Sequence, residues 1–468
     1  MNPLAARLYQ LAPAWGQNLL LTGFGMLLDR ERHGGRFAEY RDLLARTEWQ
    51  SREELEAYQD ERLRATVAHA YETVPFYRRR FDECRLTPGD VRGRQDLAKI
   101  PLLTRDDIRR HFGELRSRAV STRAMRTGHT SGTTGTPLTV GYDRESIWMT
   151  YAVFDRHYRW AGLRTDPSGD RVAVARGNVI VPLGRKAPPF WRHDRRRRQL
   201  LLSSFHLSTA NMPAYFDALR RFRPAALDGY PSTLYVLAKF LQSQGATFPL
   251  RAAITSSETL YDFQRELIEE RFACRVFDYY ALAERAIFSN ECERHHGHHV
   301  AMEYGLAEVV DDRGSPAPRG TVGRLVGTTL HNGAMPLIRY ATTDMSALGN
   351  GACPCGRGLE LMAEVTTKAE DMLTLPDGRL ISPSVLTHPF KPLDSIEGSQ
   401  IVQTAPDRVT VRLVPGAGYR QALSDHLVRE LQARLGDEVS VTVQMVDRLE
   451  MSANGKFKWV ISHVPLGI

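Results

Sequence analysis

The stretch PAALDGYPSTLYVLAKFLQSQGATFPLRAAITSS, residues 224–257, has the pattern of a strand, a helix and a second strand. Its two ends are short apolar runs, and residues 232–245 between them have the apolar spacing of an α-helix. Parallel strands need a long crossover connection, usually a helix, whereas antiparallel strands can be joined by a tight turn. The stretch therefore predicts a unit of an α/β fold with a parallel sheet.

The same alternation extends on both sides of this unit. We predict further strands within 171–181 and 274–282, and further helices over 212–222 and 260–272. Strands that alternate with helices at this spacing are typical of a largely parallel sheet whose two faces are covered.

The regions that flank this body have a different pattern. Residues 1–95 are expected to form a helical N-terminal extension, because five apolar positions within 51–81 can share one helix face: Leu55, Leu63, Val67, Ala70 and Tyr71. Residues 96–367 are expected to form the α/β body. Residues 368–468 combine short strands with one amphipathic helix at 419–436, which predicts a small α+β domain. The fold class is therefore α/β, with a large multi-layered N-terminal domain and a small C-terminal domain.

Size and composition limit the possible partners and the compartment. A chain of 468 residues is longer than one hydrophobic core usually supports, and its net charge of +8 favours anionic partners such as nucleotides, carboxylates or a membrane surface. Five cysteines are too few, and odd in number, for a disulfide framework. The apolar stretch Leu19–Leu28 is too short to span a bilayer; we predict a buried helix there, with contact to a membrane surface as the alternative. We expect a cytoplasmic monomer or homodimer.

The stretch TGHTSGTTGTP, residues 127–137, combines three glycines with many hydroxyl side chains. Glycines allow successive backbone N–H groups to converge on one anion, and the hydroxyls of Thr130, Ser131, Thr133 and Thr134 add further donors. The stretch lacks the Gly-Lys-Ser/Thr ending of a Walker loop. It predicts a polyphosphate-binding loop, with a flexible surface linker as the alternative.

This loop resembles the phosphate loop of the adenylate-forming enzymes, the superfamily of acyl-CoA synthetases, luciferases and adenylation domains. Further motifs follow in the same order: YYALAE at 279–284, IRYATTD at 338–344, the hinge-like TTKAEDML at 366–373, and SANGKFKW at 452–459. The segments TVAHAYETVPFYRRRF, LDGYPSTLYVLAKFL and CPCGR resemble the phenylacetate:CoA ligase branch, especially its relatives beside capsule and exopolysaccharide genes. The resemblance covers nearly the whole chain.

The resemblance implies ATP-dependent activation of a carboxylic acid as an acyl-AMP, with release of pyrophosphate and with Mg²⁺ as the metal. It implies transfer of the acyl group to an acceptor, first of all CoA, and a mobile small domain that rotates between the two steps. Two alternatives remain open: an amide or ester ligase that uses an amine or carrier protein instead of CoA, and a nucleotide-binding scaffold that has lost catalysis.

The resemblance also implies roles for individual residues. Lys456, Glu284 and Thr130 are expected to be catalytic. The nucleotide is expected to contact Ser131, Gly132, Thr133, Thr134, Gly135, Ser257, Glu258, Tyr279, Tyr280, Asp344 and Lys368. Asp371 is the expected hinge residue, and Tyr230, Pro231 and Ser256 are expected to line the pocket for the acid. The chain departs from the family pattern at Ala281 and Ala283, where Gly and Thr or Ser are usual, and at Lys368, where Arg is usual.

Two further clusters lie outside these motifs. The stretches ECERHHGHHV (291–300) and CPCG (353–356) offer thiols and imidazoles, which are typical zinc ligands. We predict a structural zinc held by Cys292, His299, Cys353 and Cys355, with His298 as the substitute imidazole; reduced cysteines beside solvated histidines are the alternative. The run RHDRRRRQ (192–199) is a solvated basic face or a contact for CoA phosphates, an anionic sugar or lipid headgroups. Nucleic acid is not an expected partner, because no recognised binding fold accompanies this run.

Overall fold

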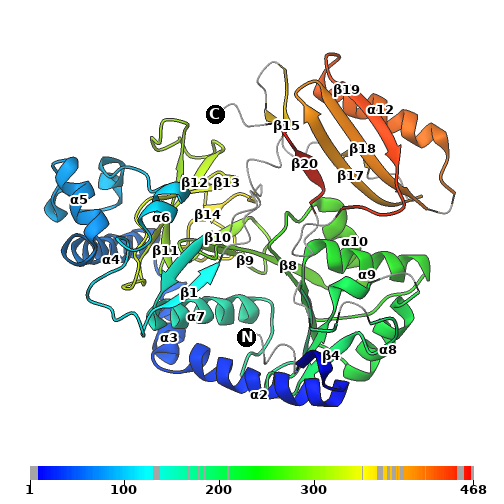
Figure 1. Ribbon diagram of the computed structural model, residues 1–468, viewed down its shortest axis with the longest axis horizontal. Helices are drawn as coiled ribbons and strands as arrows, with labels where there is room; N and C mark the ends of the chain where they lie inside the picture. The colour runs from blue at the N-terminus through cyan, green and yellow to red at the C-terminus, as the bar shows by residue number, and fades with distance from the viewer. Residues whose placement is uncertain are drawn as a thin grey trace.

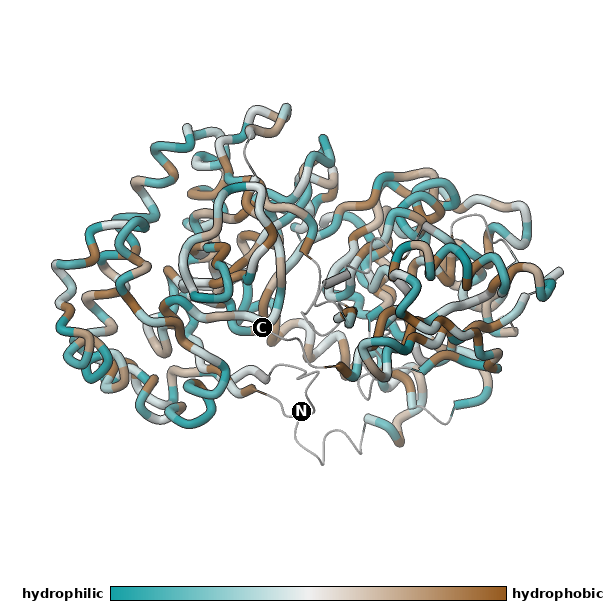
Figure 2. The backbone as a smooth tube through the Cα atoms, turned by 90° about the horizontal axis from the view of Figure 1, so that it is seen from above, coloured by the Kyte–Doolittle hydropathy of each residue, from teal (hydrophilic) through white to brown (hydrophobic). Residues whose placement is uncertain are grey.

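A computed structural model shows a large α/β part and a smaller C-terminal domain (Figure 1). The structure describes residues 9–129, 138–166, 168–176, 180–182, 185–207, 210–349, 351–365, 373–376, 380–381, 386, 388–390, 395–416, 418–450 and 458–464. In the view from above, the most apolar segments of the tube lie largely inside the two halves of the molecule (Figure 2).

The N-terminal region is helical, as predicted. Its helices are α2 (Ala14–His33), α3 (Phe37–Thr47), α4 (Arg52–Thr73), α5 (Pro75–Glu83) and α6 (Arg105–His111). A capping box between Ser51 and Glu54 starts α4, and Pro75 ends it by starting α5. On α4 the predicted face is confirmed, because Leu55, Leu63, Val67 and Ala70 are buried, while Tyr71 is half-buried.

A nine-stranded sheet in the order β14-β10-β9-β8-β7-β6-β3-β5-β4 forms the body. Its five central strands are parallel: β5 (Gln199–Leu202), β3 (Val172–Ala175), β6 (Ala226–Gly229), β7 (Ala252–Ser256) and β8 (Arg275–Ala281). Antiparallel strands extend both edges: β4 (Trp191–Asp194), and β9 (Phe288–Glu291), β10 (His298–Val300) and β14 (Leu361–Met362). The predicted strand-and-helix alternation is confirmed.

Helices cover both faces of this sheet. One apolar cluster packs α8 (Met212–Phe222), α9 (Pro231–Ser243) and α10 (Asp262–Phe272) against one face. A second cluster packs α3 and α7 (Arg144–Trp160) against the other. The strands β6 and β7 are buried along their whole length, so they lack the alternation of buried and exposed residues that a strand with one solvated face shows.

Two smaller antiparallel units complete the large part. One is a hairpin of β1 (Arg126–His129) and β2 (Thr139–Tyr142), and the other is the sheet of β11 (Gly305–Val310), β12 (Gly323–Thr329) and β13 (Tyr340–Ser346). The β1–β2 hairpin flanks the glycine-rich stretch, of which residues 130–137 lie outside the described residues.

The C-terminal domain is a four-stranded sheet in the order β19-β18-β17-β20 with one helix. Its elements are β17 (Ile396–Ala405), β18 (Arg408–Pro415), α12 (Gln421–Leu435), β19 (Ser440–Met445) and β20 (Val460–Ser462), preceded by the short pair β15 (Leu373–Thr374) and β16 (Leu380–Ile381). Leu427, Leu431 and Leu435 of α12 join the buried cluster of this domain. The predicted small α+β unit is thus present.

The prediction of a buried helix over Leu19–Leu28 is wrong. The segment forms α2, but among the residues of this helix only Gln17 and Gly25 are buried, whereas Leu19 is 62% exposed and Leu27 is 64% exposed. The helix packs against the protein through the half that contains Gln17 and Gly25. Of the described helices, none has the length and apolarity needed to cross a membrane.

Candidate active site

The carboxyl ends of the parallel strands define the site. Arg176 follows β3, Tyr230 follows β6, Ser257 follows β7 and Glu284 lies in the turn after β8, so all four lie at the same edge of the sheet. The strands β3 and β6 are neighbours in the sheet. After β3 the chain continues on the side of β5, whereas after β6 it continues on the opposite side, to β7. In open α/β sheets, ligands bind at such a point, where the connections of adjacent strands diverge.

A buried polar cluster occupies this divergence point. The Arg176 guanidinium donates to the carboxylate of Asp228, to Tyr279 Oη at 2.9 Å and to Ser256 Oγ at 3.0 Å, and Tyr158 Oη also donates to Asp228. Burial alone would lower the pKa of Arg176, but the negative charge of Asp228 outweighs it and raises that pKa. The guanidinium is therefore firmly charged and fixed in place.

The cluster shows where two predicted site residues lie. Ser256 is buried and bonded to Arg176, and the ring of Tyr279 stacks on Phe288 with 5.4 Å between ring centroids. Sequence reasoning missed Arg176 and Asp228. A signal for Asp228 was present, since a charged residue inside the apolar run ALDG needs a buried partner.

Two tyrosine–carboxylate hydrogen bonds bring distant motifs together. Tyr280 points away from Tyr279, as successive strand residues do, and its hydroxyl donates to Asp344 Oδ2 at 2.6 Å. Tyr340 Oη donates to Glu284 Oε1 at 2.6 Å. The strands β8 and β13 thus place Tyr280, Glu284 and Asp344, which the sequence assigned to one nucleotide site, in one region of the structure.

The environment of Glu284 is unusual for a carboxylate. Burial raises its pKa and so does the charge of Asp344, while the hydrogen bond from Tyr340 and the Arg105 guanidinium, 3.6 Å away, lower it. Neither Tyr340 nor Arg105 was assigned a role from the sequence: Tyr340 lies within the IRYATTD motif, whereas nothing near Arg105 distinguishes it from other arginines. The carboxylate of Glu284 offers hard oxygen ligands, which suit Mg²⁺ shared with nucleotide phosphates.

The other predicted site residues divide into two groups. Tyr230 caps α9, Pro231 is its first residue, and Glu258 follows Ser257 in the loop after β7. Ser257 has φ of +71°, a left-handed conformation that costs a non-glycine residue about 1–3 kcal/mol and that clusters at functional sites. The remaining predicted residues lie outside the described residues: Thr130, Ser131, Gly132, Thr133, Thr134, Gly135, Lys368, Asp371 and Lys456.

The C-terminal domain contacts the large part at the same edge of the sheet. Tyr261, directly before α10, lies with its ring 5.1 Å from that of Trp459, and Phe263 lies 6.3 Å from it. Trp459 Nε1 donates to Ser399 Oγ at 3.0 Å, which holds the indole in its own domain. Trp459 follows Lys456 by three residues in the sequence.

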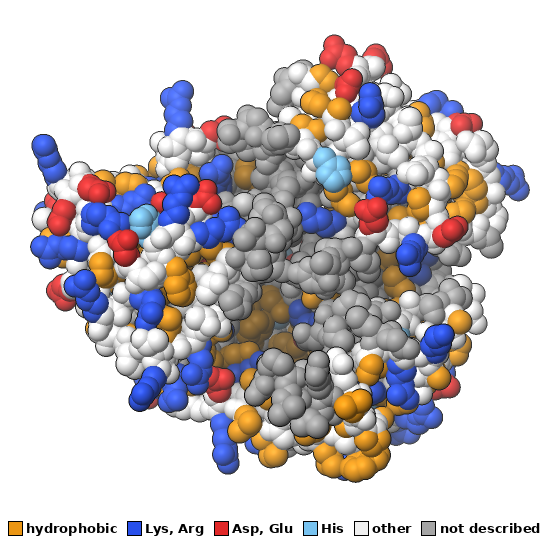
Figure 3. Space-filling view, viewed as in Figure 1, with side chains coloured by type: hydrophobic (Ala, Val, Ile, Leu, Met, Phe, Trp, Pro, Cys, Tyr) orange, Lys and Arg blue, Asp and Glu red, His pale blue; other side chains and the backbone are white. Residues whose placement is uncertain are grey.

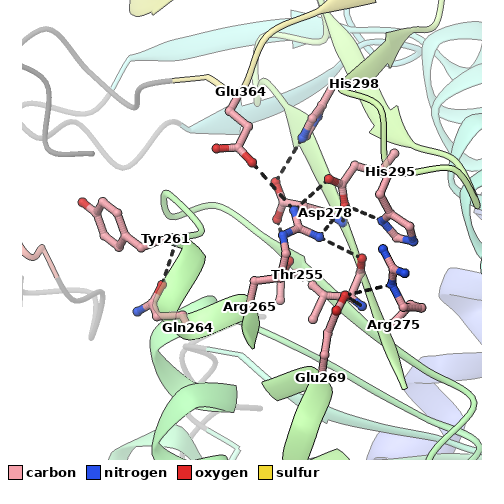
Figure 4. Close-up of polar contacts among 12 residues, drawn as sticks. Thr255, Tyr261, Gln264, Arg265, Glu269, Arg275, Asp278, His295, His298 and Glu364 are labelled. Carbon is pink, nitrogen blue, oxygen red and sulfur yellow. Dashed lines mark hydrogen bonds and ion pairs between the residues drawn. The ribbon is translucent and has the colours of Figure 1, made fainter. Parts of the chain in front are cut away.

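A second buried network connects α10, the sheet and the segment ahead of the expected hinge (Figure 4). Arg265 donates to both oxygens of Glu291, at 2.7 and 3.2 Å, and lies 3.8 Å from Glu364. Burial alone would raise the pKa of Glu291, but the His295 imidazole, 3.5 Å away, and the charge of Arg265 lower it to about 2. Burial raises the pKa of Asp278, and the charge of Glu291 adds to this rise.

The predicted zinc ligands converge on the face of β10 that is opposite to Asp278 and the network around Arg265. The donor atoms of Cys292, His299, Cys353 and Cys355 all lie within 4.8 Å of one another. Cys292 Sγ is 3.7 Å from Cys353 Sγ, close to the roughly 3.8 Å that two thiolates at about 2.3 Å from a tetrahedral zinc would have. Burial lowers the pKa of His299 to about 3, which keeps the imidazole neutral as a ligand must be.

The substitute ligand His298 does not join this cluster. Its Nε2 lies 3.6 Å from Asp278 Oδ2, because neighbouring residues of β10 point to opposite faces of the sheet. His299 Nδ1 is buried and has no hydrogen-bond partner among the described residues. Three thiols and one imidazole form the donor set of a closed structural zinc site, so these residues fit the metal.

Comparisons with known proteins identify the family. The pattern of the CapK C-terminal domain matches residues 373–463. The chain is 32% identical over 346 residues to phenylacetate-coenzyme A ligase of Thermus thermophilus, which covers 69% of this chain and 72% of that protein. It is 24% identical over 466 residues to Protein CapK of Staphylococcus aureus, covering 98% of this chain and 99% of that one.

A crystal structure of 2-hydroxyisobutyryl-CoA ligase in the postadenylation state, in complex with R3-HIB-AMP, has the same fold. The TM-score is 0.72 at 22% identity, over 89% of this chain and 91% of that one. The chain therefore belongs to the phenylacetate-coenzyme A ligase family of adenylate-forming enzymes.

Proposed function

We propose that the protein activates a carboxylic acid with ATP, forming an acyl-AMP and pyrophosphate, and then transfers the acyl group to the thiol of CoA. The observation that carries this proposal is the convergence of Glu284 and Asp344 at the carboxyl edge of the sheet, each held by a tyrosine hydroxyl. Curated relatives named phenylacetate-coenzyme A ligase support the reaction class.

In the first step an oxygen of the acid attacks the α-phosphate of ATP, and the bond to pyrophosphate breaks. Charge moves among phosphate oxygens, so catalysis depends mainly on positioning and electrostatic stabilisation. Asp344 would accept hydrogen bonds from the ribose hydroxyls, and Tyr280 orients it. Glu284 would hold Mg²⁺, whose positive charge offsets that of the phosphates; Tyr340 and Arg105 favour the ionised form of Glu284 that this needs.

The segments outside the described residues complete the proposed site. Thr130 and residues 131–135 would bind the phosphates, and Lys456 would approach the oxygens between the acid and the α-phosphate. The contact of Trp459 with Tyr261 supports this role for Lys456, because it brings the chain that follows Lys456 to the nucleotide edge of the sheet. Lys368 would contact the nucleotide, and Asp371 would be the hinge residue about which residues 368–468 rotate relative to 1–95 and 96–367.

The acid would bind beside the Arg176 cluster, between Tyr230, Pro231 and Ser256. Position supports this placement, since these residues lie where the connections of β3 and β6 diverge. The pocket residues do not define which acid binds, so the experiment uses a panel of acids.

A structural zinc is a separate part of the proposal. We expect about one zinc per chain by elemental analysis of the purified protein. Cys353→Ser should lose the metal and unfold at a lower temperature, whereas Cys274→Ser, which changes a half-buried thiol outside the cluster, should keep it. If the wild-type protein folds and contains no zinc, and the Cys274→Ser variant contains none either, this part of the proposal is contradicted.

The reaction is tested by exchange of labelled pyrophosphate into ATP with a panel of carboxylic acids, followed by product analysis with and without CoA. We expect exchange with at least one acid and an acyl-CoA product only when CoA is present. Exchange followed by transfer to an amine or carrier protein without CoA would identify the amide or ester ligase instead. No exchange with any acid, in a folded sample that binds ATP, would favour the scaffold.

A further inference from the structure

The molecule has an apolar surface that the ligase reaction does not use. Seven of the eleven large apolar side chains that are exposed in the described part of the chain lie within residues 11–27: Leu11, Trp15, Leu19, Leu20, Phe24, Met26 and Leu27. Single exposed apolar residues are ordinary, but a contiguous patch marks an interaction surface. Figure 3 shows apolar side chains gathered at the lower edge of the molecule, where Figure 1 places α2.

The orientation of α2 is the reverse of that of an ordinary surface helix. At 3.6 residues per turn, positions 15, 19, 20, 24, 26 and 27 fall on one half of the helix, and this half faces outward. The half that faces the protein carries the polar or small residues Gln17, Asn18, Thr22 and Gly25, together with the half-buried Leu21 and Leu28. Gln17 Nε2 donates to the Tyr9 carbonyl at 2.8 Å, and Gly25 lies against Asp194, which is 2.5 Å from where a Cβ would be.

Backbone contacts with the neighbouring hairpin hold the helix in this orientation. The backbone N–H of His193 donates to Asn18 Oδ1 at 2.9 Å, and that of Arg195 donates to Thr22 Oγ1 at 3.2 Å. The polar side chains Asn18 and Thr22 therefore find their hydrogen-bond partners in β4 and in the turn after it. These bonds fix the orientation of the helix, so its apolar half is held facing outward.

Positive charge borders the apolar half. The turn between β4 and β5 carries Arg195 to Arg198, and Arg30 is exposed near the C-terminal end of α2. Arg197 pairs with Asp194 at 2.7 Å and Arg196 with Asp29 at 3.2 Å, which neutralises part of this charge. Residues 29–32 and 194–198 together contain six arginines and three acidic residues, so the net charge of this border is positive.

We propose that this face binds the surface of an anionic lipid bilayer. The helix α2 would lie flat in the interface with its apolar half among the acyl chains, and Arg30 and Arg195 would contact lipid phosphates. A helix with a large outward apolar half, a tryptophan and flanking arginines has the features of an interfacial helix. A two-fold pair of chains fits less well, because both contacting surfaces would carry the same net positive border, whereas an anionic bilayer complements it.

Vesicle flotation of the full chain tests the proposal. We compare vesicles of phosphatidylcholine alone with vesicles that also contain phosphatidylglycerol, at low and high salt. The combined variant Trp15→Gln, Leu19→Gln, Leu27→Gln should lower binding to the anionic vesicles by on the order of 100-fold. Arg30→Gln with Arg195→Gln should lower it by about 5-fold per arginine, and high salt should do the same to the wild type.

A matched control removes apolar side chains elsewhere. Val322→Gln with Met445→Gln changes two exposed apolar residues outside α2 and should leave binding unchanged. All variants should keep the helical circular-dichroism signal, and the combined α2 variant should keep the wild-type ligase activity, because α2 is outside the proposed site. The proposal is overturned if the folded wild type binds neither kind of vesicle, or binds both equally. It is also overturned if light scattering shows a dimer that the α2 variant converts to a monomer.

Discussion

Removing one hydroxyl group should change both the rate and the pH dependence of adenylation. Tyr340→Phe deletes the O–H that donates to Glu284 Oε1 at 2.6 Å, in a place where both side chains are buried. A hydrogen bond to a charged group contributes about 1.5–3 kcal/mol. The loss corresponds to a fall of roughly 10- to 150-fold in kcat/KM for ATP, if the ionised form of Glu284 is the active one.

The direction of the pH effect follows from the same bond. In the proposed reaction Glu284 acts as a carboxylate, so activity should fall as the pH falls through its pKa. The hydrogen bond from Tyr340 lowers that pKa against the effect of burial. Without it the pKa rises, and the decline on the acid side begins at a higher pH in the variant than in the wild type.

The assay is pyrophosphate exchange with saturating acid, with kcat/KM for ATP measured across the pH range. Tyr304→Phe is the matched control, since Tyr304 is also buried and its hydroxyl lies 3.2 Å from the neutral Thr150 hydroxyl. The control should not change the pH at which activity declines on the acid side. If Tyr340→Phe behaves like the control, with no shift and no larger loss of rate, the role assigned to Tyr340 and Glu284 is refuted.

Three further predictions concern other parts of the structure. Asp344→Asn should raise KM for ATP by on the order of 10-fold in the exchange assay, because an amide accepts the ribose hydroxyls more weakly than a carboxylate. Arg265→Met should lower the free energy of unfolding in urea by about 3–5 kcal/mol, since it leaves Glu291 buried without its cation. The pair itself should stabilise the wild type above pH 4.5 and be lost as the pH falls toward about 2. Trp459→Ala should slow exchange about 10-fold, by loosening the contact with Tyr261.

Each of these predictions has a contrary result. An unchanged KM for ATP in Asp344→Asn would show that this carboxylate does not contact the nucleotide. A wild-type urea midpoint in Arg265→Met would show that Glu291 is neutral or otherwise satisfied. A wild-type exchange rate in Trp459→Ala would show that the indole contact does not help to place the C-terminal segment.

The α/β body could be predicted because short stretches of the sequence contain the patterns of its strands and helices. Strands buried on both faces are rich in apolar residues, and the helices between them carry one apolar stripe, so β6, α9 and β7 can be recognised in residues 224–257. The helix α2 could also be predicted, but its burial was wrong. Apolar density shows that a helix has an apolar half; only its neighbours determine which way that half faces, and here β4 binds the half with Gln17 and Asn18.

The sequence located the short motifs that contain Tyr280, Glu284 and Asp344, and the fold brings those motifs together. The roles of these three residues in binding the nucleotide and its metal stay predictions. Arg105 and Arg176 were missed because their importance comes from tertiary contacts with Glu284 and Asp228, which no spacing in the sequence reveals.

A crystal structure of the protein with AMP bound would test the central claim most directly. We predict that the ribose hydroxyls contact the carboxylate of Asp344, and that the phosphate lies between the loop 130–135 and the region of Glu284. An AMP molecule bound elsewhere, or bound without contact to Asp344, would contradict the account.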